Sequence, residues 1–137
     1  MGLMIGMYQM GTGNIDVAVK DAIRTLKGQK EEEIRRQTQL FWQEEVSHRI
    51  RPLVHDVVAH HQAQSDTLVL LTGSSKYLSE CALNVLEMDD ILCTLFEVED
   101  GYFTGEGSLC YGSGKLVKAQ EYIDKTGTNW EECTFYT

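Results

Sequence analysis

The sequence has few basic residues, only twelve lysines and arginines against twenty-one acidic residues, which gives a formal net charge of -9. Such a surface repels polyanions, so we expect neither nucleic acid nor an anionic membrane as a partner. A small anionic ligand stays possible, because one phosphate needs only a local group of donors. Metal and redox motifs built on CxxC are also missing. The four cysteines are widely spaced and predict buried free thiols: Cys81, Cys93, Cys110 and Cys133.

Long apolar runs are missing as well. Nowhere do about twenty apolar residues follow one another, and the opening MGLMIGM lacks the basic start and apolar length of a secretory leader. These features predict a cytoplasmic protein in a reducing environment. With 42% hydrophobic and 24% charged residues, the 137-residue chain has the composition of an ordinary globular domain with its own core.

The only proline, Pro52, divides the chain into two parts of different character. Before it, apolar spacing predicts helices over 16–26 and from about Gln29 onwards, with ion pairs at i,i+4 on the second helix. Because proline lacks an N–H, we expect Pro52 to begin a new helix rather than to continue an old one, with Leu53 and Val58 among the residues that face a core. We therefore predict a helical segment over 1–50 and a different unit over 51–137.

The second part alternates strands with helices. The apolar run 67–71 predicts a strand buried on both faces, followed by a tight turn and a helix over 76–86. Residues 91–98 and 102–104 predict a hairpin around Asp-Gly, and a further helix ends near Gly127. The final residues 133–137 have strand composition. This order predicts an α/β fold with a mainly parallel sheet.

One candidate site follows the buried strand, at Thr72-Gly73-Ser74-Ser75. At the carboxyl end of a parallel strand, a hydroxyl and the N–H groups that open the next helix point into one crevice, where they suit a phosphate oxygen. The alternative is structural, because Thr72 or Ser74 would also serve as an ordinary cap of that helix.

A second candidate is Lys115, which follows Gly112-Ser-Gly114 and opens a helix. A lysine in the first turn is unfavourable for the helix dipole, so an anion nearby would compensate its placement. The alternative is a solvated surface lysine. The acidic turns and the histidines of the chain are predicted to be solvated, so we predict no metal ligand in this sequence.

Taken together, these segments carry a family resemblance. The strings LVLLTGSSKYLSECALNVLEMDDILCTLFEVEDGYFTGE, CYGSGKLVKAQEYIDKTG and WEECTFYT, within 51–137, resemble the phosphoserine-phosphatase-like branch of the haloacid dehalogenase hydrolases. The resemblance implies a partial Rossmann-like core over 51–137 and a small helical cap over 1–50. It also implies a phosphomonoester hydrolase with an aspartyl-phosphate intermediate, a small phosphorylated substrate and Mg²⁺ as the cofactor.

The resemblance assigns a role to each candidate residue. Thr72 matches the hydroxyl of the second family motif and would hold the transferring phosphoryl group, with N–H groups from Gly73 and Ser74. Lys115 matches the lysine of the third motif and would neutralise charge in the transition state. Both residues are therefore predicted to act in phosphate binding and catalysis.

The sequence departs from the family at both ends. No Asp-x-Asp-x-Thr motif, which carries the nucleophile, occurs in it, and the chain stops where the fourth motif with its metal-binding Asp pair should begin. The Mg²⁺ ligands of the family are therefore not in this chain. We expect a truncated phosphatase. The alternatives are a non-catalytic pseudo-phosphatase that binds a small anion or a protein partner, and self-association through an exposed sheet edge.

Overall fold

The computed structural model describes residues 15–137, so the opening segment 1–7 discussed above lies outside the described residues. No helix in this part is both long and apolar enough to cross a membrane. The elements follow one another as α1 (Ile15–Thr25), α2 (Glu31–Phe41), η1 (Trp42–Val46), η2 (Ser47–Arg49), α3 (Pro52–Ala63), β1 (Val69–Ser75), α4 (Lys76–Leu86), β2 (Asp90–Glu99), β3 (Tyr102–Ser108), α5 (Ser113–Thr126) and η3 (Trp130–Glu132).

The predicted helices are present and begin and end close to the predicted residues. Pro52 occupies the first turn of α3, where its missing N–H costs no helical hydrogen bond. Gly127 ends α5 in the left-handed conformation, with φ of 71°. All four cysteines are free thiols; Cys93 and Cys110 are buried, and Cys81 and Cys133 are half-buried.

The sheet of the described chain has three strands in the order β1-β2-β3. β1 and β2 are parallel and are connected by α4, whereas β2 and β3 form an antiparallel hairpin. Asp100 and Gly101 turn the hairpin with φ values of 51° and 83°, the left-handed geometry that the Asp-Gly pair predicts. The mixed α/β architecture is therefore as expected, with one parallel and one antiparallel pairing.

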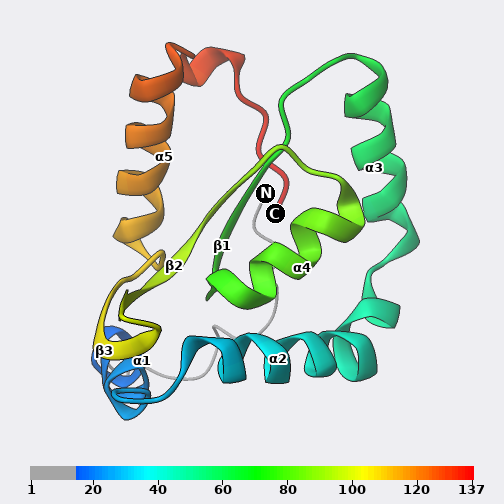
Figure 1. The fold of residues 1–137 in the computed structure, drawn as a ribbon. Helices are drawn as coiled ribbons and strands as arrows, with labels where there is room; N and C mark the ends of the chain where they lie inside the picture. Colours follow the sequence, from blue (N-terminus) through cyan, green and yellow to red (C-terminus); the bar gives the residue numbers. More distant parts are fainter. Residues whose placement is uncertain (1–14) are drawn as a thin grey trace.

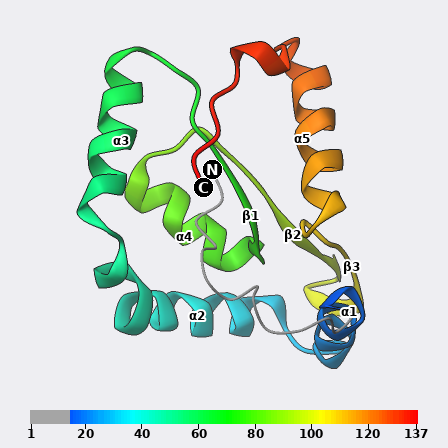
Figure 2. The same ribbon diagram turned by 180° about the vertical axis from the view of Figure 1, so that it is seen from behind.

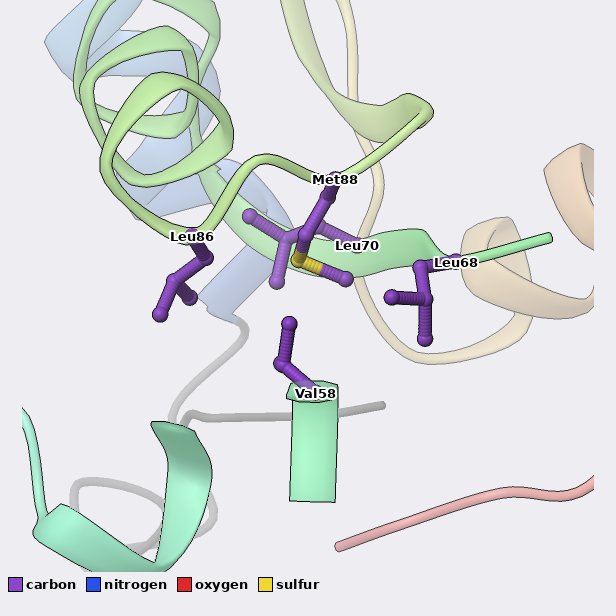
Figure 3. Close-up of a cluster of buried hydrophobic side chains, with 5 residues drawn as sticks. All are labelled: Val58, Leu68, Leu70, Leu86 and Met88. Atoms are coloured by element: carbon purple, nitrogen blue, oxygen red, sulfur yellow. The ribbon is translucent and has the colours of Figure 1, made fainter. Parts of the chain in front are cut away.

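The helices surround this sheet in a simple arrangement. Figures 1 and 2 show α5 on one side of the β1–β2 pair and α3 on the other, with α4 packed against both strands and α2 crossing beneath α4. A cluster of five buried apolar side chains joins α3, β1 and the end of α4 (Figure 3). Its members are Val58, Leu68, Leu70, Leu86 and Met88.

Helix α2 is attached differently, because none of its residues is buried. The Arg35 guanidinium pairs with Glu80 of α4 and with Glu31 of its own helix, the latter at 3.1 Å. It also lies over the Tyr77 ring, 4.9 Å from the ring centroid, and the Tyr77 hydroxyl donates to Glu31 at 3.2 Å. The joint between α2 and α4 is therefore charged.

Three expectations need correction. Cys133–Thr137 is not a strand: the segment pairs with no strand of the described chain, so its β composition has no ladder to join. Leu53, expected in the core, is 69% exposed, because Val58 and not Leu53 faces β1. Thr72 to Ser75, expected as a turn that follows the strand, is the irregular end of β1 itself, so the chain turns within the strand and not after it.

Candidate functional site

The candidate site begins where β1 loses its regular pairing with β2. Leu71 lies opposite Leu92, but the next paired residue, Ser75, lies opposite Thr94, so three residues of β1 face one residue of β2. Thr72, Gly73 and Ser74 therefore leave the ladder. Their backbone groups need other partners, because an unpaired buried peptide group is costly.

Side-chain hydroxyls supply some of those partners. The Thr72 Oγ1 atom is buried with its residue and accepts a hydrogen bond from the Ser74 N–H at 3.1 Å. That bond folds the three residues into a local turn and leaves the hydroxyl proton of Thr72 to be donated elsewhere. The strand therefore ends in a compact turn with a threonine hydroxyl at its base.

Ser75, and neither Thr72 nor Ser74, caps helix α4. Its side chain accepts from the Leu78 N–H at 3.2 Å, and its backbone carbonyl accepts from the Ser79 hydroxyl at 2.7 Å. The alternative that Thr72 or Ser74 caps this helix is therefore wrong, because the cap is Ser75. Thr72 is left without a capping role.

A buried threonine on β2 holds this turn from the other side. The Thr94 hydroxyl donates to the Gly73 carbonyl at 3.0 Å and accepts from the Cys110 N–H at 3.1 Å, and only 3% of the residue is exposed. Thr94 therefore connects the turn after β1 with the loop that leads into α5.

That loop is shaped by two glycines. Gly112 has φ of 53°, a left-handed value, and a Cβ added to Gly114 would lie 2.7 Å from the Leu109 carbonyl oxygen. The Gly114 N–H then donates to Tyr111 and the Lys115 N–H to Gly112 as α5 begins. A larger residue at Gly114 would force the loop apart. The Gly-Ser-Gly sequence thus delivers Lys115 to the first turn of α5.

Cys110, in the loop before Lys115, is next to the Thr72 backbone. Burial raises the pKa of the Cys110 thiol, while the positive charges of Lys118 and Lys115 and a backbone hydrogen bond from Thr72 oppose that rise. The fully buried Cys110 side chain therefore contacts the Thr72 backbone. Within residues 15–137, Lys115 makes no ion pair with a carboxylate.

The open side of the turn faces a cavity of about 430 Å³ between β1, α3 and α4. Thr72 and Ser74 line it together with mainly apolar side chains, among them Trp42 and Leu78. Lys115 is not part of this lining, so the described structure does not bring Lys115 and the two β1 residues into one cavity. A second cavity, of about 370 Å³, lies between β1 and α5.

Cation ligands do not gather at this site. No group of three His, Cys, Asp or Glu side chains that could hold a metal ion occurs among residues 15–137. The donors near the turn are neutral hydroxyls and thiols, whereas a Mg²⁺ site in a protein is usually built on carboxylates. The described residues therefore do not fit a magnesium site.

One histidine of α3, His61, forms two side-chain hydrogen bonds that the sequence did not predict. His61 Nδ1 lies 2.7 Å from Asp66 Oδ2, and His61 Nε2 lies 2.7 Å from the Tyr136 hydroxyl. Expected as part of a solvated helix end, the His61 side chain is in fact only 16% exposed. This group fastens the last residues of the chain to α3.

Sequence reasoning missed Thr94 and Cys110 as parts of the site. Both looked like ordinary core positions, because a threonine in a buried strand and an isolated cysteine carry no motif. One signal was available: Thr94 is a polar residue inside an apolar strand, and a buried hydroxyl requires partners.

Comparison with known proteins agrees with this architecture. The sequence model of the haloacid dehalogenase-like hydrolases matches residues 3–137, nearly the whole chain. A probable phosphatase of Mycobacterium tuberculosis strain H37Rv is 29% identical over 93 residues, which cover 64% of this chain and 32% of that protein. The same values hold for an uncharacterized protein of strain CDC 1551. The match thus spans about a third of the length of these curated relatives.

Solved structures share the fold at low sequence identity. A protein of unknown function from Bordetella pertussis Tohama I has a TM-score of 0.74 at 20% identity, covering 85% of this chain and 53% of that one. A probable phosphoserine phosphatase from Vibrio cholerae has a TM-score of 0.60 at 14% identity, and the match covers 83% of this chain and 34% of that one. A phospho-aspartyl intermediate analogue of phosphoserine phosphatase has a TM-score of 0.57 at 14% identity, and the match covers 87% of this chain and 55% of that one.

Proposed function

This chain belongs to the haloacid dehalogenase-like hydrolase family, and we propose that it forms the phosphate-holding part of a phosphatase. The observation that supports this most directly is the buried Thr72 hydroxyl at the irregular carboxyl end of β1, which does not cap α4 and lines the larger cavity. Lys115 lies in the first turn of α5, and the loop before it is joined to the Thr72 turn by hydrogen bonds of Thr94. Fold neighbours that include phosphoserine phosphatases agree with a phosphorylated small molecule as the substrate.

In the proposed mechanism, the residues of this chain bind and neutralise the transferring group. The Thr72 hydroxyl donates its proton to one phosphoryl oxygen, and the Gly73 N–H donates to another. Because Ser74 already gives its N–H to Thr72, its part would be to hold that hydroxyl in place. The Lys115 ammonium compensates negative charge that develops as the phosphoryl group moves. These interactions stabilise the transition state without forming a covalent bond.

The nucleophile would come from a strand that this sequence does not contain. β1 has a strand partner on one side only in the described chain, and the cavities of about 430 and 370 Å³ lie on its two faces. Tyr136 and Thr137 line the first cavity, and Cys133 to Phe135 line the second. We place the family's Asp-x-Asp strand between β1 and this segment. There it would bring carboxylates, and with them Mg²⁺ as a cofactor, to the Thr72 turn.

Under the same proposal, 1–50 would act as the cap and 51–137 as the core. The partly exposed, charged attachment of α2 to α4 supports this division, because ion pairs that water can reach separate at low cost. Trp42 and Val46, which follow α2 and line the larger cavity, would then face the leaving group of the substrate.

Binding of inorganic phosphate to the chain tests the core of this proposal. Calorimetric titration should show saturable binding that weakens at least about tenfold in Thr72→Val and in Lys115→Ala, as expected for the loss of a charge-assisted contact. Lys125→Ala is the matched control, because Lys125 lies in the last turn of the same helix. Equal weakening in all three variants, or no binding by the unmodified chain, would count against the proposed site.

Complementation tests the catalytic half. We expect no hydrolysis of p-nitrophenyl phosphate by the chain alone, since no Asp-x-Asp occurs in its 137 residues. Adding a segment with Asp-x-Asp-x-Thr ahead of the chain, in the presence of Mg²⁺, should create turnover, and Asn in place of its first Asp should abolish it. If phosphate binds but no fused segment gives turnover, the chain is a non-catalytic anion-binding protein, the second candidate function.

A further inference from the structure

We infer that Thr94 is a positioning residue that fixes the distance between the Thr72 turn and the loop leading to Lys115. Its single hydroxyl connects the two segments: it donates to the Gly73 carbonyl at 3.0 Å and accepts from the Cys110 N–H at 3.1 Å. The positioning role rests on the proposed phosphate site, whereas the structural connection does not.

The geometry of β1 explains why such a connection is needed. The ladder between β1 and β2 is interrupted from Leu71 to Ser75, so the backbone of Gly73 is not held by regular pairing. Thr94 is the residue of β2 that pairs with Ser75, immediately beyond the interruption. Its side chain therefore replaces a missing ladder bond with one from a hydroxyl, at the place where the turn would otherwise be free to move.

The loop before α5 depends on the same hydroxyl. Cys110 is fully buried, and its N–H donates to Thr94, while its thiol contacts the Leu92 carbonyl at 3.5 Å. Five residues later the chain reaches Lys115, after the close approach of Gly114 to Leu109. A shift of Cys110 would therefore move the start of α5 and its lysine.

The Thr94 hydroxyl donates one hydrogen bond to the Thr72 turn and accepts one from the loop before α5, and both bonds are buried. Removing the hydroxyl while keeping the side-chain shape, as in Thr94→Val, leaves the Gly73 carbonyl and the Cys110 N–H without this partner. Unpaired buried groups favour local opening, because they recover their hydrogen bonds only with water. Opening at Thr94 would uncover Cys110 first.

Selective labelling of cysteine measures that opening. Maleimide labelling followed by peptide mass spectrometry should show Cys110 reacting about tenfold faster in Thr94→Val than in the unmodified chain. Cys93, buried on the same strand, is the internal monitor of global unfolding and should change by less than about threefold. Thr94→Ser, which keeps the hydroxyl, should restore slow labelling. Thr104→Val, which removes a hydroxyl bonded to Glu97 on the hairpin, is the matched control.

The outcomes separate the connection from the function. Equal acceleration at Cys93 and Cys110, or no acceleration at Cys110, would overturn the connection. Phosphate titration then tests positioning: Thr94→Val should weaken binding about tenfold although Thr94 does not touch the phosphate, and Thr94→Ser should keep it. Selective labelling in a chain that binds no phosphate would overturn the proposed site and leave the connection intact.

One measurement needs no variant. In the unmodified chain, the Cys110 amide should exchange its hydrogen as slowly as the amides of the β1–β2 ladder, because both are held by buried bonds. Exchange at the rate of an exposed loop would overturn the connection even if Thr94→Val proved too unstable to study.

Discussion

Helices α2 and α3 both attach to the α/β unit, but they do so by opposite chemistry. α3 contributes Val58 to an apolar cluster with Leu70 and Leu86, whereas α2 buries no residue and uses the Arg35 ion pairs with Glu31 and Glu80. Apolar burial is not subject to charge screening, but ion pairs that are partly exposed are screened by salt. The comparison teaches that α3 belongs energetically to the core, while α2 is held by contacts that changing conditions can loosen.

The largest test of this contrast removes part of the apolar cluster. Leu70→Ala should lower the free energy of unfolding by about 3 kcal/mol, because it deletes buried methyl groups and leaves a cavity. Urea denaturation measures the loss, which should be the same at low and high salt. Leu53→Ala is the control on α3, since Leu53 is 69% exposed. A similar loss in both variants would show that burial of apolar side chains does not determine how strongly α3 is attached.

Alkaline pH should act on the charged joint through Tyr77. Burial and the neighbouring Glu31 carboxylate raise the pKa of Tyr77. Above about pH 10 the unfolded tyrosine ionises while the folded one keeps its proton, so stability is lost as pH rises, by at most about 1.4 kcal/mol per pH unit. Tyr77→Phe should flatten this part of the pH profile of urea unfolding. Tyr102→Phe, on the exposed hairpin, should leave the slope unchanged.

The ion pairs themselves should contribute less. Arg35→Gln should lower the free energy of unfolding by about 1 kcal/mol at low salt, and the difference should shrink in 0.5 M NaCl. Arg36→Gln is a closely matched control, because among residues 15–137 the ion-pair partner of Arg36 is Glu33 of its own helix, not a residue of α4. An effect of Arg35→Gln that persists in salt would indicate stacking on Tyr77 rather than charge.

The smallest expected effect concerns the end of the chain. Tyr136→Phe removes the hydroxyl bonded to His61 and should cost about 0.5–1 kcal/mol. Hydrogen exchange of residues 133–137 should rise in this variant, while exchange within α2 should not. If α2 responded as well, the two attachments would not be independent.

Much of this fold is predictable from the sequence because local signals agree with the final structure. Pro52, the Asp100-Gly101 turn and Gly127 each impose a backbone geometry that needs no tertiary partner, and the elements they bound are where the spacing places them. The strand predicted over 133–137 failed for the opposite reason. A strand exists only with a neighbour, and composition cannot report whether one is present.

The candidate site was only partly accessible to the same reasoning. Thr72 and Lys115 stood out through their positions after a strand and at a helix start. Thr94 and Cys110 did not, because their importance lies in contacts between segments 16 to 21 residues apart, which no local pattern encodes. Whether Thr72 and Lys115 bind one phosphate stays a prediction.

The two outer edges of the sheet, formed by β3 and β1, differ in what covers them among the described residues. Beside β3, Gly28 donates to Phe103 at 2.8 Å and Lys30 forms an isolated antiparallel bridge with Tyr102, so the stretch after α1 occupies that border. In the described chain, β1 has no such cover on its outer side. A second sheet that approached the β3 border would therefore meet the stretch after α1 instead of unpaired backbone, so edge-to-edge growth is blocked on that side.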